Sequence, residues 1–230
     1  MSTKLIFFEG RLSTIEHILS VKDISKTIGK KKLICSTSFE LHGGHVYGFT
    51  GENGSGKTML FRILSGLVKP TTGTVHMDGI DIHTRGFLPS IGLIIEYSSL
   101  WPDLTGFENL LFLSELNKRA TEKDIIAVMK RVGLNPDNQL PIRKYSLGMR
   151  QRLNLAQAIM ERPDFLFLDE PTNSIDQDGV VLVRKIICEE SKRGAVVLLT
   201  SHISQDICEL CDAIFQVNSG ACSLMAGGAT

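Results

Sequence analysis

The segment that most constrains this chain is 51–58, which reads Gly-Glu-Asn-Gly-Ser-Gly-Lys-Thr and follows the apolar run 46–50. A glycine, four residues and then Gly-Lys-Thr is the spacing of a phosphate-binding loop. Its glycines let successive backbone N–H groups turn toward one anion, because no Cβ obstructs the approach. Helix-forming residues follow at 59–64, so the loop opens a helix whose positive end faces the phosphates. We therefore predict a strand, a phosphate loop and a helix in direct succession.

The polar residues of this loop have separate expected tasks. Lys57 reaches the β- and γ-phosphates, and the Thr58 hydroxyl takes one position on Mg²⁺. The other loop residues that we expect around the phosphates are Gly51, Asn53, Gly54, Ser55 and Gly56. The alternative, a glycine-rich turn before an ordinary helix, would give none of them a ligand.

Composition narrows the class of protein and its partners. A chain of 230 residues with 43% hydrophobic residues forms one large domain or two small ones around a sizeable core. Lys plus Arg equals Asp plus Glu, at 25 each, so the chain lacks the basic balance of nucleic-acid binders. Polar residues and glycines interrupt the longest uncharged run, 213–230, and residues 1–10 do not resemble a signal peptide. We expect a cytoplasmic protein that reaches a membrane only through a partner.

The cysteines are odd in number and scattered along the chain. They are Cys35, Cys188, Cys208, Cys211 and Cys222. Without a secretory signal, free thiols in a reducing cytosol are the simpler interpretation. Cys208 and Cys211 form a C-x-x-C, but no second pair or histidine cluster completes a zinc site. We expect core or surface cysteines without a metal.

Short apolar runs alternate with helical patterns along the chain. Strands are expected over 19–41 (a hairpin with its turn at 29–32), 46–50, 74–77, 91–95, 165–169 and 196–200. Helices are expected from the phosphate loop to Gly66, from about 104, from Thr121, from Ser146 to Glu161, and over 179–191, ahead of a closing helix and strand. This order predicts an α/β fold whose parallel sheet is buried on both faces.

Two acidic residues extend the predicted nucleotide site. Asp169 follows the apolar run 165–168, and a carboxylate at the end of a buried strand can hold Mg²⁺ directly or through water. Glu170 is then placed to orient and polarise the attacking water. Acidic residues that merely end a strand are the alternative. The phosphate loop upstream and the Pro-Thr-Asn segment at 171–173 disfavour it.

With these motifs assembled, the chain resembles the ATP-binding subunits of ABC (ATP-binding cassette) transporters over about 19–220. Residues 145–152, Tyr-Ser-Leu-Gly-Met-Arg-Gln-Arg, stand where the family has its signature, most often Leu-Ser-Gly-Gly-Gln. The segment 174–176 matches the D-loop, and His202 matches the catalytic switch histidine. The resemblance implies that Ser146, Gly148 and Asp176 contact ATP, with the signature binding the γ-phosphate of the ATP on the opposite subunit. Two chains would then sandwich two ATPs.

The resemblance also implies an architecture and a set of partners. The expected fold is a P-loop NTPase cassette with a mainly parallel core sheet, an N-terminal antiparallel β subdomain and an inserted α-helical signature subdomain. One ATP-binding domain would fill 1–230, with the core in 19–95 and 163–220 and the helical subdomain in about 97–162. The expected ligands are ATP and Mg²⁺. The expected partners are a second ATPase subunit, identical or different, and an integral membrane permease that holds the chain at the inner membrane face, with no nucleic acid.

Several residues depart from the usual family pattern and indicate which subfamily the chain resembles. Glu96 stands where most relatives have the Q-loop glutamine, and it is expected near the nucleotide and Mg²⁺. Ile28 replaces an aromatic that usually stacks on adenine, and Met59 replaces a threonine that contributes its backbone N–H. Together with the segment 101–110, Glu96 and the Ser-Leu-Gly-Met signature resemble the bacitracin-resistance and lantibiotic self-protection subfamily. That likeness implies export of a peptide antibiotic. Trp101 is expected either to pack on the helical subdomain or to be an exposed anchor for the permease.

Two other functions compete with transport. Soluble cassette ATPases of translation or DNA repair generally need two cassettes or long insertions, for which 230 neutral residues leave no room. A regulatory cassette that does not hydrolyse ATP would not need Lys57, Asp169, Glu170 and His202. The remaining histidines, which we interpret as structural or exposed, are His17, His42, His45, His76 and His83.

Overall fold

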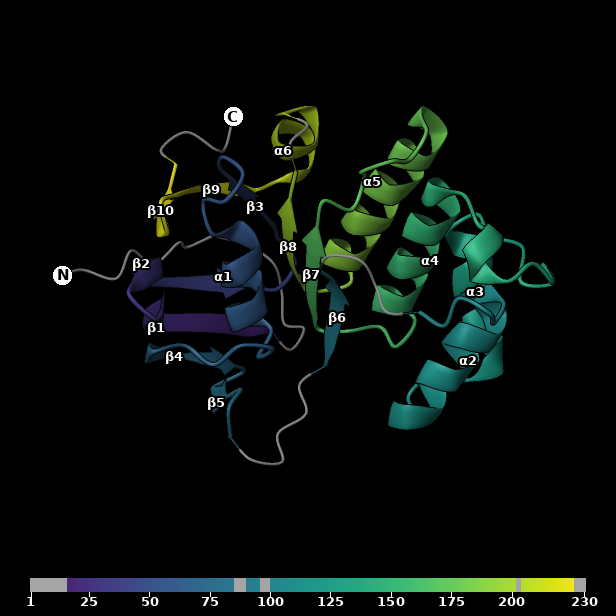
Figure 1. Cartoon of the computed structure of the whole chain (residues 1–230), viewed down its shortest axis with the longest axis horizontal. Coiled ribbons are helices and arrows are strands. Elements are labelled where there is room, and N and C mark those ends of the chain that lie inside the picture. Colours follow the sequence, from purple (N-terminus) through teal and green to yellow (C-terminus); the bar gives the residue numbers. More distant parts are fainter. Residues whose placement is uncertain (1–15, 85–89, 96–99, 202–203, 226–230) are drawn as a thin grey trace.

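A mainly parallel sheet runs through the middle of the molecule and separates its antiparallel part from its helical part (Figure 1). The computed structural model describes residues 16–84, 90–95, 100–201 and 204–225. The strands are β1 Ile18–Ile28, β2 Lys31–His42, β3 Val46–Thr50, β4 Thr72–Met77, β5 Ile80–Asp81, β6 Ile91–Ile94, β7 Phe165–Asp169, β8 Val196–Thr200, β9 Ala213–Asn218 and β10 Ala221–Leu224. The helices are α1 Lys57–Leu64, α2 Gly106–Asn117, α3 Glu122–Arg131, a 3₁₀ turn Ile142–Lys144, α4 Leu147–Ile159, α5 Gln177–Lys192 and α6 Ser204–Leu210.

The central sheet has the strand order β10-β9-β3-β8-β7-β6. All of its neighbouring pairs are parallel except β10 with β9. Side chains alternate across β7: Phe165 and Phe167 enter the core shared with the antiparallel sheet, whereas Leu166 and Leu168 enter the core under α4 and α5. Apolar residues therefore occupy the first four positions of the strand, ahead of Asp169, as expected for a sheet covered on both faces.

The antiparallel sheet has the order β2-β1-β4-β5 and encloses α1 against the central sheet (Figure 1). Leu60 and Phe61 of α1 are fully buried, and the Phe61 ring meets the Phe49 ring of β3 edge-on at 5.4 Å. This packing fixes the helix that follows the phosphate loop from both sides. The phosphate loop is therefore held in place by the packing of α1 between the two sheets, in addition to contacts within the loop.

Helices α2, α3 and α4 gather beyond the other face of the central sheet, next to α5 (Figure 1). Thr105 and Thr121 each form a capping box, with Glu108 and Asp124 three residues later. The Ser146 side chain accepts from the Met149 N–H and caps α4. In the described part of the chain, no helix combines the length and apolar character needed to cross a membrane.

The expected elements are present, with differences at their ends. The hairpin turn is shorter than predicted because β2 already begins at Lys31. Helix α4 ends at Ile159 instead of Glu161, since the chain turns through Arg162 at φ 52° before Pro163. Strands β5 and β10 and the 3₁₀ turn were not predicted. They are short, and β10 forms only because a tight turn at 219–220 folds it back on β9.

Candidate nucleotide site

The phosphate loop lies between β3 and α1, where its conformation requires glycine. A Cβ on Gly51 would lie 2.1 Å from the Val217 carbonyl oxygen, and Gly56 precedes α1 at φ 114°. The Lys57 side chain is buried and donates from Nζ to the carbonyls of Gly51 at 2.7 Å and Glu52 at 3.0 Å. Lysine therefore crosses the mouth of its own loop, which places the ammonium where phosphate oxygens would meet it.

The β9–β10 turn supports this loop from behind. The Gly220 N–H donates to the Ser55 carbonyl at 2.8 Å, and the Gly220 carbonyl accepts from the Cys35 N–H at 2.7 Å. A Cβ on Gly220 would lie 2.4 Å from the Leu33 carbonyl oxygen, so only glycine fits. The turn that leads into β10, a strand that the sequence pattern did not predict, thus ties β2 to the phosphate loop.

Two of the three predicted metal ligands, Thr58 and Asp169, meet at the end of β7. Thr58 Oγ1 donates to Asp169 Oδ2 at 2.7 Å. The other carboxylate oxygen, Asp169 Oδ1, accepts from Thr200 Oγ1 at 2.5 Å, because the parallel register sets Asp169 beside Thr200 at the end of β8. Asp169 is thereby oriented by one hydroxyl from α1 and one from the sheet.

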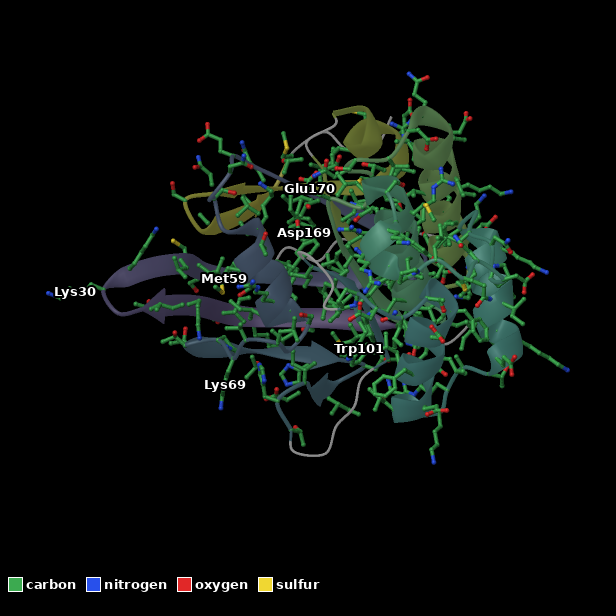
Figure 2. All side chains as sticks on the ribbon, turned by 45° about the vertical axis from the view of Figure 1, so that its right-hand side comes forward. Lys30, Met59, Lys69, Trp101, Asp169 and Glu170 are labelled. Atoms are coloured by element: carbon green, nitrogen blue, oxygen red, sulfur yellow. The ribbon has the colours of Figure 1, made fainter. Side chains whose placement is uncertain are left out.

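Glu170 follows directly and lies beside Asp169 in Figure 2. Its backbone adopts φ 51°, a left-handed conformation that non-glycine residues rarely take. Its N–H donates to Thr200 Oγ1 at 3.0 Å, and its carbonyl accepts from the Asn173 N–H at 3.2 Å and from Gln151 Nε2 at 3.2 Å. The backbone of Glu170 is therefore held at both its N–H and its carbonyl.

A cavity of about 380 Å³ brings these groups together. Its lining residues are Leu33, Asn53, Gly54, Gly56, Lys57, Thr58, Met59, Arg62, Asp169 and Glu170. Two observations fit a triphosphate with Mg²⁺. Ser55 Oγ is buried with no hydrogen-bond partner among the described residues, and the Thr58–Asp169 pair supplies the hard oxygen ligands that Mg²⁺ prefers.

The signature residues line a different cavity, of about 480 Å³. Ser146, Gly148 and Asp176 border it, together with Leu147, Met149, Arg152 and Ser174. Asp176 Oδ1 caps α5 at the Gly179 N–H and accepts from Arg152 Nη2 at 2.8 Å. None of the residues described around this cavity also lines the phosphate-loop cavity. The chain thus does not bring its own signature to its own phosphate loop.

Other predicted residues lie elsewhere. Glu96 and His202 fall outside the described residues. Ile28 ends β1 at the hairpin and is 55% exposed. Thr200 and Gln151 were not predicted as site residues, although a threonine that ends a buried strand in the same way as Asp169 could have pointed to Thr200.

Comparison with known proteins decides the family. Residues 35–173 match the sequence model described as ABC transporter. The chain belongs to the ABC transporter family. It is accordingly an ATP-binding cassette and an ATPase, with ATP and Mg²⁺ as its ligands.

Relatives and solved structures agree with this assignment. An uncharacterised ABC transporter ATP-binding protein of Bacillus subtilis, YybJ, is 46% identical over 88% of this chain and 94% of its own length. The bacitracin transport ATP-binding protein BcrA of Bacillus licheniformis is 34% identical over 88% of this chain and 67% of its own. The lantibiotic transport ATP-binding protein SrtF of Streptococcus pyogenes is 32% identical over 88% of each chain. The dimeric structure of the bacterial cassette MJ0796 superimposes with a TM-score of 0.80 at 21% identity over 91% of this chain and 99% of that one, which confirms the predicted fold class.

Proposed function

We propose that this ABC ATPase works as a pair of cassettes that enclose two ATPs and drive a separate membrane permease. The observation that carries the proposal is the separation of the two cavities. Lys57, Thr58, Asp169 and Glu170 border one, and the signature Ser146 borders the other. A signature can serve a phosphate loop only if a second cassette brings it there.

The residues around the phosphate loop divide the chemistry of hydrolysis among them. Lys57 and the backbone N–H groups of the loop hold the β- and γ-phosphates. Thr58 and Asp169 would hold Mg²⁺, which neutralises charge on the phosphate oxygens. Glu170 orients the attacking water and accepts its proton as general base. From the partner cassette, the N-terminus of α4 at Ser146 and Gly148 stabilises the charge of the γ-phosphate.

The proposed cargo is a peptide antibiotic. Support comes from relatives whose names give bacitracin and lantibiotic transport, each of which matches 88% of this chain. A permease would hold the cassette at the inner face of the membrane. The two cassettes of the pair are identical if this chain pairs with a second copy of itself.

The catalytic assignment is tested by Glu170→Gln, which keeps the size of the side chain and removes its charge. We expect the hydrolysis rate to fall about a hundredfold or more, the scale for loss of a general base, while ATP still binds. ATP should then trap a dimer on a sizing column. Glu115→Gln, at an exposed position of α2, is the matched control and should turn over normally. Near-normal turnover by Glu170→Gln would refute the role of Glu170.

The transport assignment needs a cellular test. Deletion of the gene should sensitise the cell to bacitracin or a lantibiotic, and Lys57→Ala should fail to restore resistance. Co-purification of the tagged chain with an integral membrane protein is the second expected result. Unchanged sensitivity to both peptide classes would remove the cargo and leave the ATPase assignment in place.

A further inference from the structure

Glu170, the proposed general base, has an unfavourable backbone conformation. Its φ of 51° is one that side chains with a Cβ adopt rarely, and the next residue is Pro171, which cannot donate a backbone hydrogen bond. Left to itself, this peptide would relax toward an ordinary conformation and turn the carboxylate away from its present direction. Something in the surroundings must therefore hold it.

The first group that holds it is the Thr200 hydroxyl. Thr200 is fully buried at the end of β8. Its single Oγ1 accepts from the Glu170 N–H at 3.0 Å and donates to Asp169 Oδ1 at 2.5 Å. One hydroxyl, acting as donor and acceptor at once, thus fixes the carboxylate of Asp169 and the peptide of its neighbour together.

The second group is the Gln151 amide, which binds the next peptide unit, on the carbonyl side of Glu170. Gln151 lies in the second turn of α4, the helix that Ser146 caps. Its Nε2 donates to the carbonyls of Glu170 and Pro171, each at 3.2 Å. Gln151 thereby donates its amide to two successive backbone carbonyls of the catalytic turn.

Gln151 also borders the space that joins the two candidate sites. A cavity of about 280 Å³ shares Asp169 and Glu170 with the phosphate-loop cavity, and Leu147 and Ser174 with the signature cavity. Gln151 lines this middle cavity and is the side chain through which α4 touches the Glu170 peptide. A displacement of α4 would therefore reach Glu170 through this amide.

We infer that Thr200 and Gln151 are positioning residues that hold the hydrolytic glutamate, and that Gln151 ties its orientation to the signature helix of the same chain. The inference rests on the role proposed above for Glu170. Thr200 acts on both Asp169 and Glu170, whereas Gln151 acts on the Glu170 turn alone. Substitutions at the two residues should therefore have different kinetic effects.

Gln151→Met tests the amide, because methionine keeps the length of the side chain and removes both donors. We expect kcat for ATP hydrolysis to fall about tenfold, less than the roughly hundredfold cost of a 1 Å misplacement, with the Kd for ATP unchanged within about twofold. Gln157→Met makes the same substitution at a half-buried position further along α4 and should leave both constants unchanged. A normal kcat for Gln151→Met would overturn the inference for this residue.

Thr200→Val and Thr200→Ser test the hydroxyl. Valine replaces it with a methyl group of similar size, so kcat should fall about tenfold and the Mg²⁺ concentration for half-maximal activity should rise several-fold. Serine restores the hydroxyl and should restore both values to within about threefold. Gln151→Met should leave the Mg²⁺ dependence unchanged. If Thr200→Val does not fold, Thr200→Ser tests the hydroxyl alone. Normal kinetics of Thr200→Ser would support the inference for Thr200, and a tenfold lower kcat would overturn it. The Gln151 variants test the amide independently.

A double-variant experiment separates this inference from the role of Glu170 itself. In a Glu170→Gln background, Gln151→Met should lower the residual rate less than about twofold, because there is no general base left to position. A further tenfold loss would mean that Gln151 acts elsewhere and would overturn the inference. If Glu170→Gln is inactive while Gln151→Met and Thr200→Val are normal, only the inference fails. If Glu170→Gln is active, the proposed role of Glu170 fails and the inference with it.

Discussion

The guanidinium of Arg131, the last residue of α3, donates from Nη1 to the Glu190 carboxylate of α5 at 2.6 Å. Glu190 is only 3% exposed and also accepts from Arg193 Nε at 3.0 Å. Burial lowers the pKa of Arg131, but its hydrogen bonds to Glu190 and Glu189 outweigh burial and leave that pKa raised. The pair joins the helical region to the helix that follows the nucleotide site, so its loss should loosen that contact.

Arg131→Ala should lower the free energy of unfolding by about 1–3 kcal/mol. Removing one partner of a buried pair usually costs more, but here Arg193 remains and Arg131 is itself one-third exposed. Arg143→Ala is the control, because Arg143 pairs with Asp103 at the surface and such pairs contribute about 0–1 kcal/mol. Urea unfolding of both variants measures the difference. Equal losses would show that burial of Glu190 adds nothing to the Arg131 contact.

Ile28→Tyr should tighten ATP binding several-fold. Ile28 is exposed at the end of β1, and the neighbouring Leu33 of β2 lines the phosphate-loop cavity. An aromatic ring stacked on adenine adds about 0.5–1.5 kcal/mol beyond simple burial, which corresponds to roughly two- to twelvefold in affinity.

Isothermal titration with ATP checks this prediction, and titration with inorganic triphosphate is its internal control. The triphosphate has no base to stack, so its affinity should not change. Ile80→Tyr places the same ring on β5, where the isoleucine is 45% exposed, and should leave ATP binding unaltered. An unchanged ATP affinity in Ile28→Tyr would mean that another residue covers the base.

The nucleotide site illustrates how far the sequence alone reaches. The meeting of Lys57, Thr58 and Asp169 in one cavity could be predicted because phosphate and Mg²⁺ chemistry requires these residue types in recognisable motifs. The Thr200 and Gln151 contacts could not, since they join residues 30 and 19 positions apart whose meeting depends on strand order and helix placement. Helix starts at Thr105, Thr121 and Ser146 were predictable for the same local reason as the phosphate loop, whereas β10 depends on tertiary pairing with β9.

Cys222 should resist alkylation far more than Cys208. Burial raises the pKa of the Cys222 thiol from 9.0 to about 12, whereas Cys208 is exposed. The thiolate is the reactive form, and a rise of the pKa from 9.0 to about 12 lowers the thiolate fraction about a thousandfold at pH 8.

Brief treatment with iodoacetamide followed by mass spectrometry should therefore label Cys208 and spare Cys222 from pH 7 to 9. In urea, where burial is lost, Cys222 should react like the other cysteines. Rapid native labelling of Cys222 would mean that β10 does not stay packed on β9 and β2.

The Trp101 side chain packs on α2 and is also partly exposed, and its role as a permease anchor stays a prediction. Its ring packs edge-on against Phe112 of α2, with centroids 4.6 Å apart, yet it remains 42% exposed and Phe112 45% exposed. Its backbone N–H donates to Oδ1 of the fully buried Asn109 at 2.8 Å, and its carbonyl accepts from Asn109 Nδ2 at 3.1 Å. The backbone is thus fixed while two aromatic rings face outward together. Figure 2 shows Trp101 apart from the Asp169–Glu170 pair.

Trp101→Ala should leave the isolated chain folded and its ATP affinity unchanged within about twofold, because Asn109 binds only the backbone of residue 101. Association with the proposed permease should weaken about thirtyfold, since truncation of a buried aromatic anchor costs about 2 kcal/mol or more. Pull-down from detergent-solubilised membranes against a concentration series of the chain measures the change. Leu67→Ala removes another exposed apolar side chain, 60% exposed just beyond α1, and should bind as the unmodified chain does. Equal capture of Trp101→Ala and Leu67→Ala would place the permease contact away from this aromatic pair.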